Sequence, residues 1–259
     1  MVMDEVPWSG KANRKPIIKL IDVEIGYNQP LVKIPDLEIF PGEIVAIAGP
    51  SGVGKTTLLR TIAGLVRPIS GRLEVCGATH PSKPVRGSLG YVPQRLGLVR
   101  HTSVIHNVMI GANAGHNKSL WSILTSEEPK FRSIWSKITS KNAKKYALSA
   151  IESMGLTEKL NEPIRKLSGG QQRRVATART LAQQPSLIMA DEFLSELDED
   201  TMIMVMNEVT EYIRNSDAAL LVVEHDISRA KSMADRLLVI DDGRINPFIS
   251  EVTALEVKI

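Results

Sequence analysis

The chain has 259 residues, of which 43% are hydrophobic and 24% charged, and its 32 basic residues are nearly balanced by 29 acidic ones. A chain of this length can bury a sizeable core, while a net charge of +3 is too small to indicate nucleic acid binding. The single cysteine, Cys76, excludes an internal disulfide and fits a reducing compartment, so a disulfide-based secreted scaffold is excluded as well.

The two ends of the chain read as accessory segments. Residues 1–16 are polar and have no apolar centre, so we expect a mobile lead-in rather than a signal peptide. Residues 248–259 are expected to form a C-terminal tail. No apolar run approaches the roughly 18 residues that a membrane-spanning helix needs. We therefore expect a cytoplasmic protein that is peripheral on the inner face of the cell membrane only through a partner.

Short apolar runs alternate with helix-length patterns through most of the chain. Strands are predicted at 17–23, 43–49, 71–75, 88–92, 187–190 and 218–223, and helices at 56–65, 170–183 and 200–215. This alternation predicts an α/β fold with a mostly parallel sheet and helices on both faces. Asp241-Asp242-Gly243, between the runs 237–240 and 244–245, predicts a hairpin near the end of the chain.

Residues 96–170 have helix-length patterns at 104–112, 119–124 and 143–154 and no convincing strand. They predict a helical insertion between two parts of one α/β core. From Pro129 to Ile151 the sequence has no acidic residue and six basic ones, namely Lys130, Arg132, Lys137, Lys141, Lys144 and Lys145. A solvated face is the simpler interpretation, and contact with an anionic lipid surface or an acidic partner loop is the alternative.

Residues 49–56 match the phosphate-binding pattern G-x-x-x-x-G-K-[ST] between a predicted strand and a predicted helix. Its glycines let the backbone turn tightly and direct N–H groups at an anion, and the helix start adds a favourable potential. Lys55 is expected to contact the β and γ phosphates, and Thr56 to coordinate Mg²⁺. The predicted nucleotide-binding residues of this loop are Gly49, Pro50, Ser51, Gly52, Val53, Gly54, Lys55, Thr56 and Thr57.

Two carboxylates, Asp191 and Glu192, follow the apolar run 187–190. Ligands of open α/β sheets bind at the carboxyl ends of the strands, so Asp191 is predicted to hold Mg²⁺. Glu192 is placed to orient or deprotonate an attacking water. Without the phosphate loop, a helix-capping cluster would be the simpler interpretation of this pair.

His225 and Gln94 also stand at predicted strand ends. His225 is expected to lie near the γ-phosphate, in a position equivalent to that of Asp191 on a neighbouring strand. Gln94 is a candidate contact to Mg²⁺ or to the attacking water, although a surface glutamine is the simpler alternative.

A second glycine-rich turn, Leu167–Gln171, precedes the helix predicted at 170–183. Ser168 is a suitable N-cap, but two glycines at a helix start are costly unless something approaches the backbone closely. A helix start with free N–H groups is an anion site. Since one chain has no second phosphate loop, we predict a two-fold dimer in which this turn covers the nucleotide of the other subunit. The predicted contacts of the turn are Ser168, Gly169, Gly170 and Gln171.

This set of motifs resembles the ATP-binding subunits of ABC (ATP-binding cassette) transporters from about residue 17 to 247. Walker A corresponds to 49–56, the Q-loop glutamine to Gln94, the signature to 167–171, Walker B to 187–191, the D-loop to 195–198 and the switch histidine to His225. Tyr27 resembles the aromatic residue that stacks on adenine, and Asp198 of the D-loop is a further candidate nucleotide contact. One residue departs from the pattern, because Phe193 stands where the family usually has proline after the catalytic glutamate.

The resemblance implies a P-loop NTPase (RecA-like) core, an N-terminal antiparallel β subdomain and a helical subdomain inserted at about 96–170. It implies ATP and Mg²⁺ as cofactors, with Thr56, Gln94 and Asp191 around the metal. It also implies catalytic roles for Glu192, His225, Gln94 and Lys55. The partners implied are a second ATPase subunit and separate transmembrane permease subunits, joined in an importer by a substrate-binding protein. No nucleic acid partner is expected.

The long insertion, with Trp121 and Trp135, resembles that of phosphonate-import ATPases, so a phosphonate-like anion is the expected cargo. The alternative is a non-transport ABC ATPase that acts on nucleic acid or the ribosome. It is disfavoured because no long heptad run separates the two glycine-rich motifs and the chain has one cassette. A kinase or GTPase would leave the turn at 167–171 unexplained.

Overall fold

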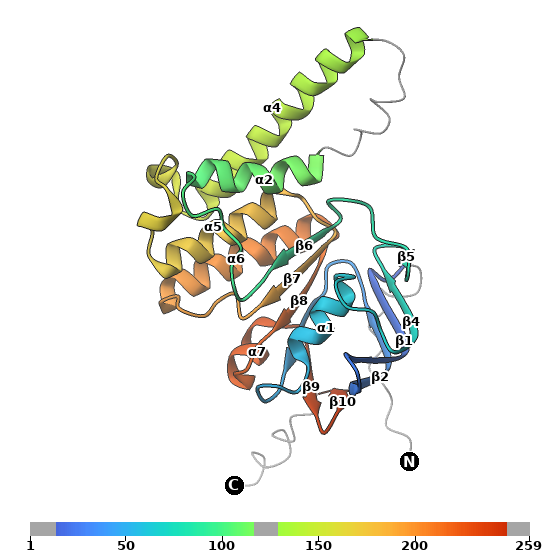
Figure 1. The fold of residues 1–259 in the computed structure, drawn as a ribbon. Helices are drawn as coiled ribbons and strands as arrows, with labels where there is room; N and C mark the ends of the chain where they lie inside the picture. Colours follow the sequence, from blue (N-terminus) through green and yellow to red (C-terminus); the bar gives the residue numbers. More distant parts are fainter. Residues whose placement is uncertain (1–13, 117–128, 248–259) are drawn as a thin grey trace.

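The structure, a computed structural model, describes residues 14–116 and 129–247, with the side chains of His116 and of residues 129–140 excepted. The predicted helix at 119–124, the tail at 248–259 and all but the last three residues of the lead-in lie outside the described residues. Figure 1 shows an α/β body from which one long helix projects.

The strands join in one sheet in the order β5-β4-β1-β2-β10-β9-β3-β8-β7-β6. Their bounds are β1 (Ile18–Gly26), β2 (Pro30–Ile39), β3 (Ile44–Ala48), β4 (Ser70–Val75), β5 (Ala78–Thr79), β6 (Leu89–Val92), β7 (Leu187–Asp191), β8 (Ala219–Val223), β9 (Arg236–Asp241) and β10 (Arg244–Pro247). The helices are α1 (Lys55–Ile62), α2 (Val104–His116), α4 (Pro129–Ser153), α5 (Gly169–Ala182), α6 (Glu199–Asn215) and α7 (Ile227–Met233), with short 3-10 turns at Thr157–Lys159 and Ile164–Lys166.

The central stretch β9-β3-β8-β7-β6 is parallel throughout, which confirms the predicted α/β fold. The N-terminal part, β1 with β2 and β4, is antiparallel, as the resemblance implies. The strand predictions missed β2, in which the more exposed Lys33, Pro35, Asp36 and Glu38 separate the buried residues Val32, Ile34, Leu37 and Ile39. They also missed β5, which has two residues.

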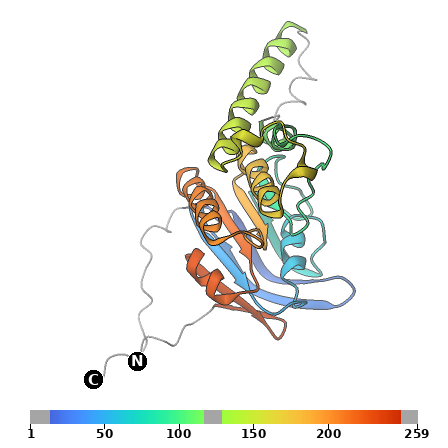
Figure 2. The same cartoon turned by 90° about the vertical axis from the view of Figure 1, so that its left-hand side faces the viewer.

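Side-chain alternation along the parallel strands builds two cores, one on each face of the sheet. Ile44, Ala46 and Ala48 of β3 belong to the core beneath α5 and α6. Val45 and Ile47 belong to the core that α1 shares with the antiparallel strands. Figure 2 shows α6 and α1 on opposite sides of these strands. The apolar runs are therefore covered on both faces, as their composition predicts.

The predicted hairpin at 241–243 is confirmed. Arg244 pairs with Asp241 in antiparallel register, and the two turn residues Asp242 and Gly243 have φ angles of 44° and 69°. Two left-handed residues give the type of turn that matches the twist of the strands.

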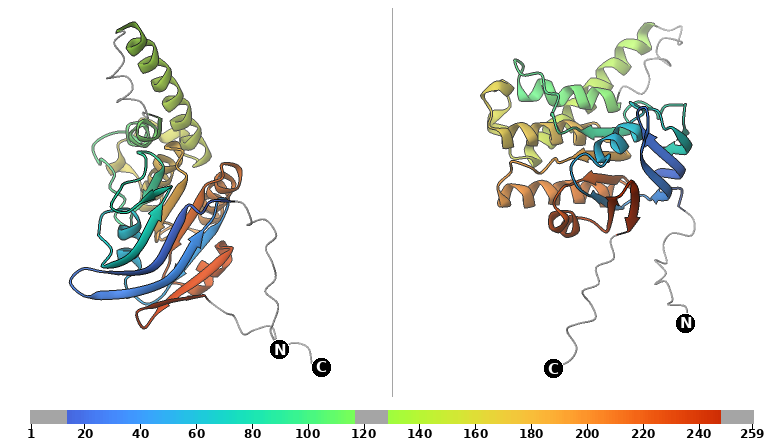
Figure 3. Two further views of the ribbon diagram at one scale, coloured as in Figure 1. Left: turned by 90° about the vertical axis from the view of Figure 1, so that its right-hand side faces the viewer. Right: turned by 60° about the horizontal axis from the view of Figure 1, so that its bottom comes forward.

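Residues 104–182 hold α2, α4 and α5, which pack on one another beside the sheet (Figure 3). The prediction of a helical insertion without strands holds for the described residues, but α4 begins at Pro129, well before the predicted 143. Lys141, Lys144 and Lys145 are exposed, which agrees with a solvated face at that end of the basic run.

Two glycines of α2 set its distance from α5. A Cβ atom at Gly111 would lie 1.9 Å from the carbonyl oxygen of Arg179, and one at Gly115 would lie 1.7 Å from that of Gln183. Because neither position has room for a side chain, the two helices touch backbone to backbone. In the described part of the chain, no helix has the length and apolar composition required to cross a bilayer.

Candidate functional site

The loop at 49–54 joins β3 to α1 in a shape that requires glycine. Gly49 has φ 151° and its Cβ would lie 2.6 Å from the carbonyl oxygen of Ile240, while Gly54 has φ 107° and would contact Val32 at 2.8 Å. Helix α1 begins directly after the loop with no side-chain cap and no acidic residue in its first turn. Its first N–H groups are therefore available to an anion.

Lys55 is held within this loop. Its Nζ donates to the carbonyl oxygens of Gly49 and Pro50, at 2.7 and 2.8 Å. Burial lowers the pKa of Lys55, and the carboxylates of Glu192 and Asp191 act in the opposite direction. The ammonium group thus binds main-chain carbonyls of the loop itself, and its contact with the β and γ phosphates stays a prediction.

Thr56 and Asp191 meet across the loop, with Thr56 Oγ1 donating to Asp191 Oδ2 at 3.0 Å. Asp191 is 2% exposed, and burial raises its pKa while the Thr56 hydrogen bond lowers it. A hydroxyl oxygen and a carboxylate oxygen are hard donors, and Mg²⁺ is commonly held by one or two carboxylates together with substrate phosphates. The two residues therefore fit a magnesium ion bound with a nucleotide.

The Glu192 carboxylate lies between two residues from neighbouring strand ends. Gln94 Nε2 donates to Glu192 Oε2 at 3.0 Å, and His225 Nδ1 lies 3.8 Å from Oε1. Glu192 itself has a φ of 51°, and its N–H donates to the carbonyl oxygen of Val223 at 3.0 Å. The ends of β6, β7 and β8 thus bring together three residues that are more than 30 positions apart in the sequence.

Arg173 of α5 is part of this site, and sequence analysis missed it. It is 5% exposed, and its guanidinium donates to the carbonyl oxygen of Glu192 at 3.2 Å and to Glu196 Oε1 at 3.3 Å. It therefore supports the backbone that carries the catalytic candidate. The available signal was its spacing, since Arg173 shares a helix face with buried Thr177 and Thr180.

Ser168 caps α5 as predicted. Its Oγ accepts from the Gln171 N–H at 3.2 Å, and its own N–H donates to Gln171 Oε1 at 3.0 Å. A Cβ atom at Gly169 would lie 2.7 Å from Glu196 Oε2, and one at Gly170 would lie 3.2 Å from Leu197. The close approach inferred from the two glycines is thus made by the loop 195–198 of the same chain, so the glycines by themselves do not require a second subunit.

The remaining predicted contacts are placed as follows. Asp198 caps α6, where hydrogen bonds from the backbone N–H and side chain of Thr201 lower its pKa. Tyr27 follows β1, is 58% exposed and accepts a hydrogen bond from Arg60 at 3.3 Å. Thr57 is buried within α1. The nucleotide contacts assigned to these three residues stay predictions.

Phe193, which replaces the expected proline, is 2% exposed and belongs to the core beneath α5 and α6. The ring anchors the segment after Glu192 in that core. A second residue that sequence analysis missed is Glu224, which is fully buried directly before His225 and has Arg229 Nη1 3.8 Å from its Oε2. Its signal was a charged residue at the end of the all-apolar run 218–223.

A phosphate loop that requires glycine, an acidic strand end and a glutamate held between Gln94 and His225 define a P-loop nucleotide hydrolase. The chain matches the family described as ABC transporter over residues 32–195, and it belongs to that family. It is an ATP-binding subunit of the ABC type and an ATP hydrolase.

Two curated relatives from Escherichia coli K12 match 81% of the chain over 221 residues. The L-cystine transport system ATP-binding protein TcyN is 35% identical and matched over 80% of its length, and the phosphonates import ATP-binding protein PhnC is 33% identical and matched over 79%.

Solved structures agree with the fold. The ATP-binding cassette MJ0796, solved as a dimer in a post-hydrolysis state bound to ADP and Pi, has 26% identity and a TM-score of 0.70, covering 90% of this chain and 99% of that one. CbiO1 of Clostridium perfringens, part of the ABC transporter complex cbiONQ, has 25% identity and a TM-score of 0.68, covering 89% and 87%.

Proposed function

We propose that two copies of this subunit, or one copy and a related ATPase subunit, close around ATP and Mg²⁺ and so drive an importer whose membrane-spanning permease is a separate polypeptide. The observation that carries this proposal is the meeting of Glu192 with Gln94 and His225 at the strand ends, which supports a role for this carboxylate in accepting a proton from a water near the phosphate loop. The dimer of MJ0796 bound to ADP and Pi supports closure in pairs.

In this proposal the loop N–H groups and Lys55 bind the phosphates, and Glu192 accepts a proton from the attacking water. Gln94 and His225, on either side of the Glu192 carboxylate, orient that water and stabilise the charge that develops on the γ-phosphate. Mg²⁺ between Thr56 and Asp191 would neutralise phosphate charge when bound. Ser168, Gly169, Gly170 and Gln171 of the second subunit would complete the site.

The permease is proposed to contact the surface around α2 and the segment that follows Gln94. Support comes from α5, because Arg179 donates to the carbonyl oxygens of Leu96 and Gly97, at 2.7 and 2.8 Å. The segment next to Gln94 is therefore fastened to the helix that starts at Ser168. A displacement of this surface by the permease would thus move both Gln94 and the signature turn at Ser168.

The proposed cargo is a phosphonate-like anion, supported by the relative named for phosphonate import. The relative named for L-cystine transport makes an amino acid the competing cargo. Because ATPase subunits act through a permease, the cargo is tested on the assembled transporter, with substrate-stimulated ATP hydrolysis as the readout. Stimulation by cystine and not by a phosphonate would contradict the proposed cargo.

Glu192→Gln tests the catalytic assignment. The variant should bind ATP as the wild type does, accumulate as a dimer on size exclusion in ATP and Mg²⁺, and hydrolyse ATP at least 100-fold more slowly. Wild-type turnover by this variant would show that Glu192 is not the base.

Purification of the tagged full chain from its membranes tests the transport role. Recovery with a polytopic membrane protein supports it, while recovery with ribosomes or nucleic acid would favour the non-transport alternative.

A further inference from the structure

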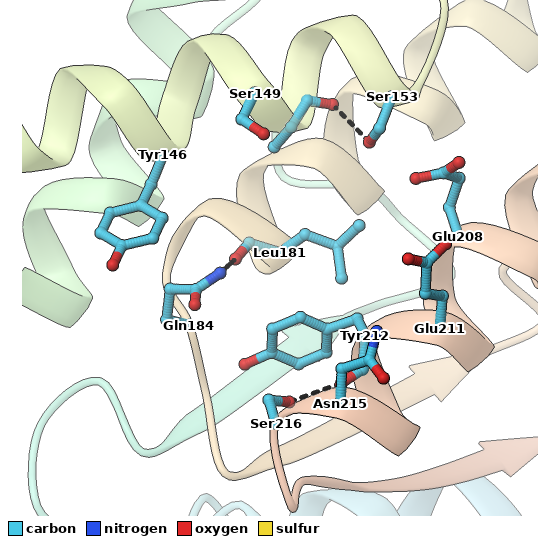
Figure 4. A pocket seen from close by; sticks show the side chains of 11 residues that line it. Tyr146, Ser149, Ser153, Leu181, Gln184, Glu208, Glu211, Tyr212, Asn215 and Ser216 are labelled. Carbon is cyan, nitrogen blue, oxygen red and sulfur yellow. Dashed lines mark hydrogen bonds between the residues drawn. The ribbon is translucent and has the colours of Figure 1, made fainter.

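A groove of about 370 Å³ lies between the C-terminal halves of α4 and α6 and the end of α5. Its walls include Tyr146 and Ser153 of α4, Gln184 just after α5, and Glu208, Tyr212 and Ser216 of α6 and its end. Figure 4 shows Tyr146 and Gln184 at one end of the groove and Glu208 with Glu211 at the other. Its size is in the range of small-ligand pockets.

Four polar side chains of the wall already give a hydrogen to a main-chain carbonyl. Tyr212 Oη donates to Pro185 at 2.7 Å, Ser216 Oγ to Tyr212 at 2.6 Å, Gln184 Nε2 to Leu181 at 3.1 Å, and Ser153 Oγ to Ala150 at 3.4 Å. The oxygens of Gln184 and Ser153 stay available as acceptors, while the hydroxyl groups of Tyr212 and Ser216 also interact with each other. The wall therefore offers two carboxylates and several acceptor oxygens, and Ser149, Gln184 and Asn215 add donors beside them.

The groove is also electronegative. Glu208 and Glu211 stand three residues apart on one face of α6, and neither has a hydrogen bond or ion pair to another described residue. No basic side chain is among the residues of the wall. Helix α4 ends at Ser153 on the side of the groove where the two glutamates lie, whereas α5 and α6 end on the opposite side, near Gln184 and Ser216.

We propose that this groove binds an arginine side chain presented by a partner polypeptide. A guanidinium has five donors and no acceptor, so it complements a wall of carboxylates and acceptor oxygens. Its head binds between Glu208 and Glu211, and its apolar stem lies along Leu181 and the ring of Tyr212. Lysine fits less well, because its ammonium cannot form a fork with two carboxylates or stack on a tyrosine ring.

The groove lies away from the nucleotide site. It contains Gln184 and Ser216, which precede β7 and β8, whereas Asp191, Glu192 and His225 stand at or after the opposite ends of these strands. Two turns of α4 form one wall and α6 forms the other, so a bound arginine would join the inserted helices to the core. The partner can therefore bind together with ATP.

The test is calorimetric titration of the full chain with the peptide acetyl-Ala-Arg-Ala-Arg-Ala-amide at low salt. Peptides with citrulline or lysine in place of arginine are the comparisons, and spermidine is the free-cation comparison. Glu208→Gln/Glu211→Gln is compared with Glu152→Gln/Glu158→Gln, which makes the same charge change at exposed positions outside the groove.

The arginine peptide should bind at least tenfold more tightly than the citrulline peptide and several-fold more tightly than the lysine peptide. The groove variant should lose at least tenfold in affinity, and the matched variant less than twofold. An equal loss of affinity in the two variants would mean that only the net charge of the protein matters, and it would overturn the proposed binding site. Spermidine binding more tightly than the arginine peptide would overturn the polypeptide partner.

Discussion

The free energy of unfolding of the Glu224→Gln variant should exceed that of the wild type at alkaline pH. At acid pH the gain from this substitution should be much smaller. Glu224 is fully buried, and neither of its oxygens has a hydrogen bond partner among the described residues. Burial raises its pKa from 4.5 to about 7, against the lowering effect of Arg229, and the carboxylates of Glu192, Asp226 and Asp191 add to the rise.

The sign of this effect follows from proton linkage. The folded protein holds the Glu224 proton more tightly than the unfolded chain does, so the associated stability is present below pH 4.5 and is lost as pH rises through about 7. The whole rise in pKa corresponds to roughly 3 kcal/mol of unfolding free energy, and about 2.5 kcal/mol of it falls between pH 5 and pH 8. Glutamine cannot ionise, so the Glu224→Gln variant does not lose this unfolding free energy as the pH rises.

The assay is urea unfolding of both proteins without nucleotide at pH 5 and pH 8. The unfolding free energy of the variant minus that of the wild type should rise by about 2.5 kcal/mol between the two pH values. Glu158→Gln, on an exposed turn, controls for exchanging a carboxylate for an amide. A difference for Glu224→Gln that stays constant across this range would refute the reasoning.

Two further substitutions test the signature turn and the helix crossing. Ser168→Arg should abolish ATP hydrolysis, because the larger side chain blocks the proposed partner subunit. It should leave the ATP affinity of the monomer within about twofold of the wild-type value. Weaker ATP binding by the isolated monomer would mean that the turn binds nucleotide in its own chain. Gly111→Ala should lower the free energy of unfolding by about 2 kcal/mol or more, since its Cβ would collide with the Arg179 carbonyl oxygen, whereas Asn113→Ala, on the exposed side of α2, should change it by less than about 0.5 kcal/mol. Equal unfolding midpoints for the two alanine variants in a denaturant titration would contradict this assignment.

Local chemistry explains what the sequence predicted well. The glycines at 49 and 54 specify a turn with left-handed backbone angles, and the all-apolar runs at 187–190 and 218–223 specify strands covered on both faces. Strand ends of a parallel sheet share one edge, so the grouping of Glu192 with His225 could be predicted without coordinates.

What depended on long-range packing was not predicted. In strand β2 two consecutive exposed residues, Pro35 and Asp36, interrupt the alternation that would indicate a strand, and α7 has too few residues to show a period. Arg173 binds Glu192 and Glu196, about 20 residues further along the chain, and no local pattern contains those contacts. The loop at 195–198 explains the closeness at Gly169, which the sequence suggested was made by a second subunit.

The glycine crossing of α2 and α5 bears on how force passes through the protein. At Gly111 and Gly115 no compressible layer of side chains separates the two helices, so they should travel as one stiff unit. Any displacement that an outside partner imposes on α2 would then reach Ser168, at the start of α5, with almost no loss. A bulkier residue at either glycine would separate the two helices, so that a displacement of α2 would move α5 less. Mechanical work would then be uncoupled from ATP consumption, even in a molecule that still folds.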